Sequence, residues 1–275
     1  MKRLTYLLLI LAVAWSCKPK TTTVTEKMDH EDHEHMEEQT GIVLKAGDLT
    51  FTEVVSDPFS DATLSLVTPV PNSTVAKGKV AFDFEVGNFE LGSQTGNQYA
   101  DHCANSAKGQ HIHLILNNSP YTAHYESTFE QDMEPGTYVG LAFLSRSYHE
   151  SIKSPTAFQI FDFTVGDKAA ESDFDATKPH MFYSRPKGEY VGKDTEKVML
   201  DFYLINADLS KEGYKVKANI NGQEVILEKW APYLMEGLPM GENTIELTLL
   251  DAEGNKVESP FNPVTRTVTL KEAAE

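Results

Sequence analysis

Beyond residue 41, short runs of apolar residues alternate with polar ones at a period of two. That spacing is typical of a β-strand with one buried face. The runs VAFDFEV at 80–86 and AFQIFDFTV at 157–165 are the clearest examples, and Gly, Asn, Asp and Pro separate such runs along the chain. No long stretch shows the period of an amphipathic helix. Many short strands between turn residues predict an all-β fold of the immunoglobulin-like sandwich type.

The β region contains an internal repeat, in which segments of its first half align in order with segments of its second half. The paired segments are 80–86 with 198–204, 111–118 with 215–222, 129–144 with 233–250, and 161–165 with 265–270. Such repetition predicts two copies of one structural unit. We therefore expect two tandem β-sandwiches, a first at 41–167 and a second, degenerate copy at 184–275, joined by a linker at 168–183.

Four of the chain's nine histidines fall in one stretch that reads as three antiparallel strands. In HIHLILNN, alternation places His111 and His113 on one face and the intervening aliphatic side chains on the other. The turn residues 117–120 predict a hairpin, and a register centred on them sets His124 opposite His113. The third strand ends just before His149, so its end meets the start of the first strand if the two are neighbours. We expect the four imidazoles to converge at one end of this sheet.

The second copy has other residues at the aligned positions, so the fold does not require imidazole there; they are Lys215, Lys217, Glu228 and roughly Gly254. The first copy also has an insertion before HIHL, which carries a further histidine and a cysteine. Imidazole nitrogen and thiolate sulfur are preferred ligands of Zn and Cu. The sequence predicts a Cu or Zn site in the first copy, with His111, His113, His124 and His149 as ligands and His102 and Cys103 as additional ones.

A second interpretation is binding of an anionic, sugar or peptide ligand, as in an envelope binding or adhesion module. The segment LSRSYHE offers hydroxyl groups, a guanidinium and a carboxylate next to one another, and such groups form charge-assisted hydrogen bonds. The candidate residues for this ligand are Ser145, Arg146, Ser147, Tyr148 and Glu150.

Motifs of enzymes are not found in the sequence: it has no serine nucleophile elbow, no H-E-x-x-H and no phosphate-cradling glycine loop. We expect a binding protein rather than an enzyme. Metal-dependent hydrolysis stays a third alternative, because a three-histidine metal with an open position can activate water.

The first 17 residues have the organisation of a bacterial export signal. Lys2 and Arg3 precede an apolar run at 4–14, which is too short to span a bilayer. A small residue directly before Cys17 resembles the lipobox of bacterial lipoproteins. That resemblance implies cleavage before Cys17, a lipid on its sulfur and a membrane anchor, and Lys18 directly after it points to the outer membrane.

Residues 18–40 are polar and acidic with no periodicity, which predicts a disordered tether. Its histidines and methionines form a weak candidate metal site, made of Met28, His30, His33, His35 and Met36.

The formal net charge of −17 disfavours nucleic acid as a partner. Cys103 is the only cysteine besides Cys17, so no disulfide framework is expected and hydrophobic cores must hold the fold. The expected partners are the membrane, through the lipid anchor, and a metal ion or small ligand.

Three motifs in residues 60–167 resemble a family of envelope lipoproteins of Bacteroidetes-type bacteria. They are the Gly-x-His-x-His strand at 109–113, the Pro-Gly turn at 135–136 and Ser-Arg-x-x-His-Glu-Ser at 145–151. Some members carry the label phosphopeptide-binding protein. The resemblance implies a small β-sandwich in the cell envelope and does not identify a ligand. The second copy lacks every histidine of the pattern, so nothing is carried over to it.

Overall fold

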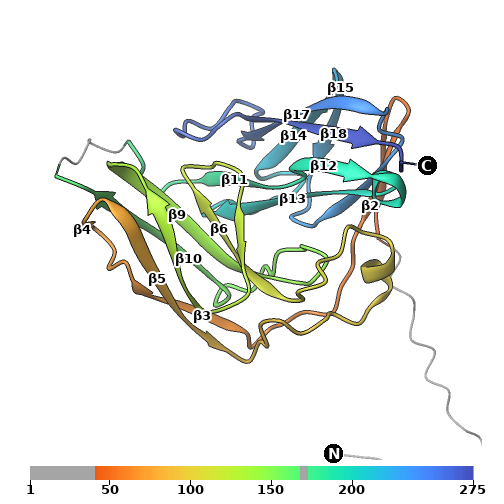
Figure 1. The fold of residues 1–275 in the computed structure, drawn as a ribbon. Helices are drawn as coiled ribbons and strands as arrows, with labels where there is room; N and C mark the ends of the chain where they lie inside the picture. The colour runs from red at the N-terminus through yellow and green to blue at the C-terminus, as the bar shows by residue number, and fades with distance from the viewer. Residues whose placement is uncertain (1–40, 168–172, 275) are drawn as a thin grey trace, which may run out of the picture. The chain divides into compact units, whose positions relative to one another are not determined.

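The computed structural model describes residues 41–167 and 173–274. These residues form strands in four sheets, with two short 3-10 turns, so the expected all-β fold with tandem sandwiches is confirmed (Figure 1). The predicted signal peptide (1–17), the lipidation residue Cys17 and the tether (18–40) with its histidines and methionines lie outside the described residues. No helix within the described residues is long and apolar enough to cross a membrane.

The first sandwich packs a five-stranded sheet, in the order β4-β10-β9-β6-β7, against a three-stranded sheet, β3-β5-β8. Its strands are β3 (Thr63–Thr68), β4 (Ser73–Val75), β5 (Gly78–Gly87), β6 (His111–Leu116), β7 (Thr122–His124), β8 (Thr128–Met133), β9 (Gly136–Ser145) and β10 (Phe158–Val165). Alternate residues of these strands form the core, where the ring of Phe82 meets those of Phe129 and Phe163. A 3-10 turn, η1 (Gln98–Asp101), lies in the insertion before β6.

The second sandwich packs sheet β12-β18-β17-β14-β15 against sheet β1-β2-β16-β13-β11. Its strands are β1 (Val43–Ala46), β2 (Leu49–Glu53), β11 (His180–Arg185), β12 (Gly188–Val191), β13 (Val198–Ile205), β14 (Lys215–Ile220), β15 (Gln223–Leu227), β16 (Tyr233–Glu236), β17 (Gly241–Leu250) and β18 (Val264–Lys271), with η2 (Gly192–Thr195) after β12.

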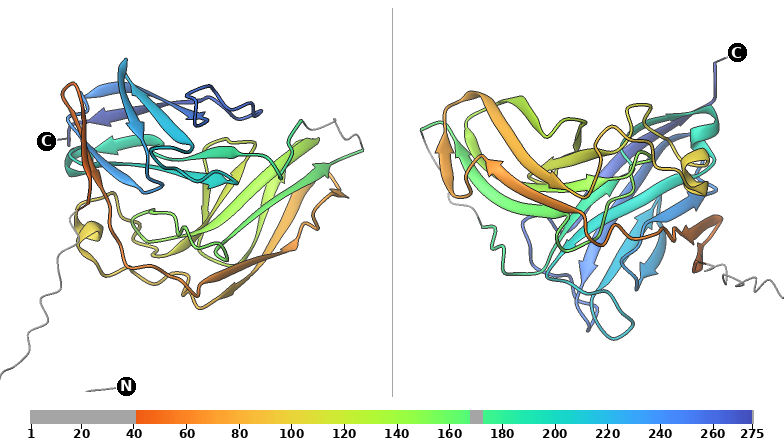
Figure 2. Two further views of the ribbon diagram at one scale, coloured as in Figure 1. Left: turned by 180° about the vertical axis from the view of Figure 1, so that it is seen from behind. Right: turned by 90° about the horizontal axis from the view of Figure 1, so that it is seen from below.

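The hairpin β1–β2 belongs to the second sandwich, whereas the sequence placed it in the first at 41–167. β2 pairs antiparallel with β16, with Phe51 opposite Met235. The orange hairpin accordingly lies beside the blue strands of the second sandwich (Figure 2). Leu49 and Phe51 are fully buried in the second core. The hairpin covers the edge that β16 would otherwise expose, and an uncovered edge favours aggregation. The expected linker at 168–183 is also shorter, because β11 begins at His180.

The sheet carrying β6 and β9 is buried on both faces. Its second face packs Ile115, Leu141 and Phe143 against Phe182 and Tyr203 of the second sandwich. The strand β6 is therefore buried at nearly every position. The face of β6 that carries His111 and His113 is turned toward the second copy rather than toward solvent.

Candidate metal centre

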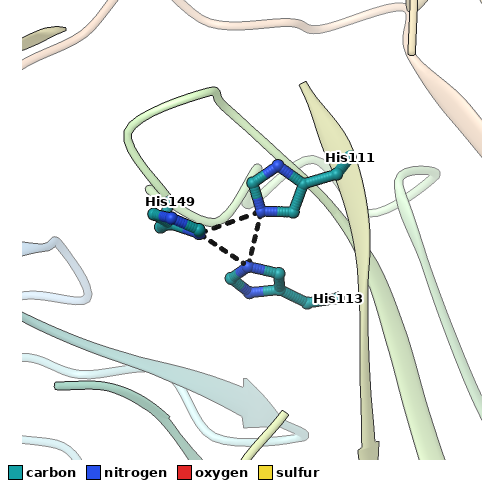
Figure 3. A group of neighbouring side chains, drawn as sticks. All are labelled: His111, His113 and His149. Carbon is teal, nitrogen blue, oxygen red and sulfur yellow. Dashed lines mark hydrogen bonds between the residues drawn. The ribbon is translucent and has the colours of Figure 1, made fainter. Parts of the chain in front are cut away.

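Three histidines of the first sandwich bring one ring nitrogen each to a common point (Figure 3). Nε2 of His111 lies 2.8 Å from Nε2 of His113 and 3.0 Å from Nδ1 of His149. Nε2 of His113 lies 3.3 Å from Nδ1 of His149. We name this group the histidine triad. Its members are three of the four histidines that the sequence predicted to converge.

Local strand geometry explains how the triad is assembled. His111 and His113 are two residues apart on β6 and share its face. β6 runs antiparallel to β9 with His111 opposite Ser145, so the end of β9 lies beside the first histidine. A tight turn follows, in which the Arg146 amide donates to the Glu150 carbonyl and the His149 amide donates to the Arg146 carbonyl, both at 2.9 Å. His149 has φ +69°, a conformation that few side chains adopt without support from their surroundings.

The tautomer of His111 follows from its second ring nitrogen. Nδ1 lies 2.8 Å from the backbone carbonyl oxygen of Gly109, so Nδ1 carries the proton and donates it. Nε2 of His111 then presents a lone pair to the other two rings. At metal sites, the ring nitrogen of a histidine that does not bind the metal usually donates to such a carbonyl, which orients the imidazole.

Burial keeps the triad neutral. Desolvation lowers the pKa of His111 to about 4, with the cations Arg185 and Lys187 lowering it further and the Gly109 carbonyl opposing them. Desolvation is also the largest cause that lowers the pKa of His113 and His149, followed by their neighbouring histidines and Arg185. At neutral pH the three rings therefore offer lone pairs rather than charges.

The triad cannot satisfy all of its short contacts with hydrogen bonds. The lone pair of His111 Nε2 accepts one hydrogen bond, yet two ring nitrogens lie within 3.0 Å of it. Nδ1 of His113, the ring nitrogen that does not contact the other two histidines, is buried and has no hydrogen-bond partner among the described residues. A cation at the common point would turn the two contacts of His111 Nε2 into favourable ones, because each ring nitrogen would then point its lone pair at the ion.

The spacing approaches that of three ligand nitrogens around one tetrahedral ion and is shorter for the pairs made by His111. Zn–N bonds of 2.0–2.1 Å place neighbouring ligand nitrogens about 3.3 Å apart, and the triad's separations are 2.8, 3.0 and 3.3 Å. Among the described residues, no cysteine or carboxylate joins the group. One coordination position is left for another ligand.

Three further residues surround the triad, and no sequence motif pointed to any of them. The ring of Tyr121 stacks on His113 with centroids 3.6 Å apart, and its hydroxyl lies 3.3 Å from Nδ1 of His149. The ammonium of Lys187 lies 3.7 Å from the centroid of the Tyr121 ring. Arg185, which is buried, interacts electrostatically with all three histidines. Lys187 and Arg185 come from the second copy, so no local pattern could have found them.

The prediction that His124 joins the cluster is wrong. β7 pairs with β6 so that His124 is opposite Ile112 and Ala123 is opposite His113. A shift of one residue moves a side chain to the other face of a sheet. His124 accordingly stacks on Phe129 with centroids 3.3 Å apart. The loop between β6 and β7 contains an odd number of residues, whereas the register expected from the sequence requires an even number.

His102 and Cys103 also lie outside the triad. Cys103 is buried against Val54, Tyr148 and Met199. Burial raises the pKa of its thiol to about 11, so the side chain is a protonated, apolar filler rather than a thiolate ligand. The His102 side chain is exposed.

The residues proposed for an anionic, sugar or peptide ligand are buried, and most of them build the turn that carries His149. Tyr148 donates a hydrogen bond to Glu150, whose carboxylate also lies 3.2 Å from Nε of Arg146. The Ser147 hydroxyl accepts a hydrogen bond from the Thr95 amide, and the Ser145 hydroxyl donates to backbone carbonyls.

Two of these five candidates, Arg146 and Glu150, line a cavity of about 420 Å³. Its other lining residues come from both copies, among them Phe59 of the first and Trp230 of the second. We refer to it as the Phe59–Trp230 groove.

No family model and no curated protein matches the sequence. Among solved structures, the chain is similar to the fibronectin(III)-like modules of Clostridium thermocellum CbhA, at 13% identity over 77% of this chain and 95% of that one, with a TM-score of 0.27. It is also similar to the Bacteroides ovatus mixed-linkage glucan utilization protein SGBP-B, solved with a mixed-linkage heptasaccharide, at 11% identity over 81% of this chain and 47% of that one, with a TM-score of 0.21. The central fibronectin-III array of RIM-binding protein shares 9% identity over 78% of this chain and 69% of that one, with a TM-score of 0.26.

Proposed function

We propose that the protein binds a metal ion, Cu or Zn, through His111, His113 and His149. The observation that carries the proposal is the convergence of three neutral imidazoles within 3.3 Å of one another, with more lone-pair contacts than hydrogen bonds can satisfy. Imidazole is the ligand type that Cu and Zn share. His124 and Cys103 have no part in this site.

The test measures the melting temperature of residues 41–275 with and without Zn(II) or Cu(II). An ion that binds only the folded chain stabilises it by about 2.7 kcal/mol at a hundredfold excess over Kd. His113→Ala should abolish this shift. His124→Ala is the matched control, because that histidine lies on β7 outside the triad, and its shift should remain. Equal shifts in the two variants would contradict the proposal. Starting at residue 41 removes His30, His33 and His35 from the titration.

A second candidate function is supported by the Phe59–Trp230 groove. Its volume lies in the range of small-ligand sites. Its charged lining residues are already paired inside the protein, Arg146 with Glu150, Lys153 with Asp201 and Lys229 with Glu53. A lining with balanced charges and two aromatic rings suits a neutral sugar better than an anion. Titration with neutral oligosaccharides should change Trp230 fluorescence, and Phe59→Ala should weaken that response; no response to any of them would contradict this candidate.

We propose binding rather than catalysis for both sites. Around the triad, the described part of the chain contributes the phenols of Tyr121 and Tyr125 and the cations Arg185 and Lys187, and no carboxylate stands among its ligands as a general base.

We also propose that the chain is a lipoprotein of the cell envelope, anchored at Cys17 and sorted to the outer membrane. The charged start, the apolar run and the Ser16-Cys17 junction support this proposal. Labelled fatty acid should enter the full chain and not the Cys17→Ala variant. A variant that still carries label and sediments with membranes would contradict it.

A further inference from the structure

We infer that the hydroxyl oxygen of Tyr121 is the fourth ligand of the metal held by His111, His113 and His149. This inference rests on the proposed metal-binding function and assigns the position that the triad leaves open. The completed site would have three nitrogen ligands and one phenolate oxygen.

The Tyr121 hydroxyl lies close to the histidine triad. It is 3.3 Å from Nδ1 of His149, and Nε2 of His113 is also 3.3 Å from this Nδ1. With respect to His149, the hydroxyl therefore stands at the distance expected between two ligands of one ion. Two structural contacts fix its ring: stacking on His113 at 3.6 Å and the Lys187 ammonium at 3.7 Å from its centroid.

The surroundings of the triad are positively charged. A divalent ion on three neutral imidazoles would add two positive charges beside Arg185 and Lys187. Arg185 is buried, its Nη2 donates to the Tyr190 hydroxyl and its Nη1 to the Tyr148 carbonyl. Its Nε has no hydrogen-bond partner among the residues that the structure describes. No ion pair links Arg185 or Lys187 to a carboxylate in the described part of the chain. Buried charge of one sign requires compensation.

The phenolate supplies that compensation from within the chain. When the ion binds, the O–H bond of Tyr121 breaks, its electron pair forms the bond to the metal, and the proton leaves to solvent. Burial raises the pKa of the Tyr121 hydroxyl to about 12, and the guanidinium of Arg185 opposes that rise, so the phenolate forms only when the ion takes up its oxygen. The cations Arg185 and Lys187, which would oppose a site made of histidines alone, favour a site with a phenolate.

The experiment titrates residues 41–275 with Cu(II) and records the visible absorption spectrum. A phenolate bound to Cu(II) gives a charge-transfer band that imidazole and water ligands do not give. The wild-type chain should show this band. Tyr121→Phe should bind Cu(II) and lack it, because the substitution keeps the ring stacked on His113 and removes the oxygen only. Its Zn(II) affinity should fall by about tenfold or more.

Tyr125→Phe is the matched control. The Tyr125 ring lies 5.0 Å from that of His111, and its hydroxyl is 2.7 Å from the Ser106 hydroxyl, away from the common point of the triad. This variant should keep both the band and the affinity.

Each outcome separates the two proposals. Cu(II) binding by the wild-type chain without the band, or a Tyr121→Phe variant with unchanged spectrum and affinity, overturns the assignment of Tyr121 and leaves the three-histidine site standing. A wild-type chain that binds no metal overturns both.

Discussion

The backbone carbonyl of Gly109 accepts a hydrogen bond from Nδ1 of His111 at 2.8 Å, and this contact determines which nitrogen of His111 faces the triad. Gly109 has φ +84°, and a Cβ atom there would lie 2.2 Å from the carbonyl oxygen of Gly92. The insertion before β6 therefore contacts the site through backbone that only glycine can form.

Gly109→Ala should accordingly damage both the fold and the site. We expect a loss of about 1–3 kcal/mol in the free energy of unfolding, from backbone strain and the clash with Gly92. Zn(II) affinity should fall because His111 loses its orienting acceptor. Urea unfolding and a Zn(II) titration measure the two effects. Gly96→Ala is the control, since a Cβ atom at Gly96 would meet nothing within 4 Å.

Stability should fall as the solution becomes acidic. The pKa of His111 is about 4 in the folded chain and about 6.5 when unfolded, so between these values the unfolded chain binds a proton that the folded chain does not. The metal-free protein should lose about 2 kcal/mol from His111 alone between pH 7 and pH 5. His113 and His149 act in the same direction. Urea unfolding across this range measures the slope, and His111→Gln should reduce it; an unchanged slope would refute this account.

The second sandwich should depend on the β1–β2 hairpin. Phe51 is fully buried in the core of that sandwich, so Phe51→Ala should cost about 3–5 kcal/mol. By the same reasoning, a fragment of residues 184–275 lacks the partner of β16 and should not unfold cooperatively. Ile42→Ala, at a side chain that is 47% exposed, serves as the control. Cooperative unfolding of the isolated fragment would show that the hairpin is dispensable.

The two copies should be coupled through Asp201. This buried carboxylate of β13 pairs with Nζ of Lys153 at 2.7 Å and accepts a hydrogen bond from the Ser151 amide at 2.9 Å, two residues beyond His149. Asp201→Ala leaves the Lys153 ammonium, whose side chain is only 17% exposed, without its partner and should cost about 3–5 kcal/mol. The double variant with Lys153→Ala should lose less than the two single variants together. Lys79→Ala, in an exposed pair with Glu130, should change stability by less than about 1 kcal/mol.

Sequence pattern alone determined the fold class and most of the triad. The alternation in HIHLIL fixes His111 and His113 on one face, because side-chain direction along a strand is a local property. The comparison of the two copies showed that these histidines are not needed for the sandwich. The sequence also placed His149 near His111, on the expectation that β6 and β9 are antiparallel neighbours. The structure has this pairing.

Tertiary structure decided what depends on loop length and on partners distant in the chain. The sequence placed His124 on the wrong face of the sheet, because a loop longer by one residue after β6 changes the register. The types of residue in a turn do not reveal the exact length of the loop. The hairpin β1–β2 belongs to the second sandwich because β2 forms backbone hydrogen bonds with the edge strand β16, whose polar backbone groups would otherwise be unpaired. Arg185 and Lys187 reach the triad only because the second copy packs against the buried sheet of the first, and the period of a strand carries no information about which surface it will meet.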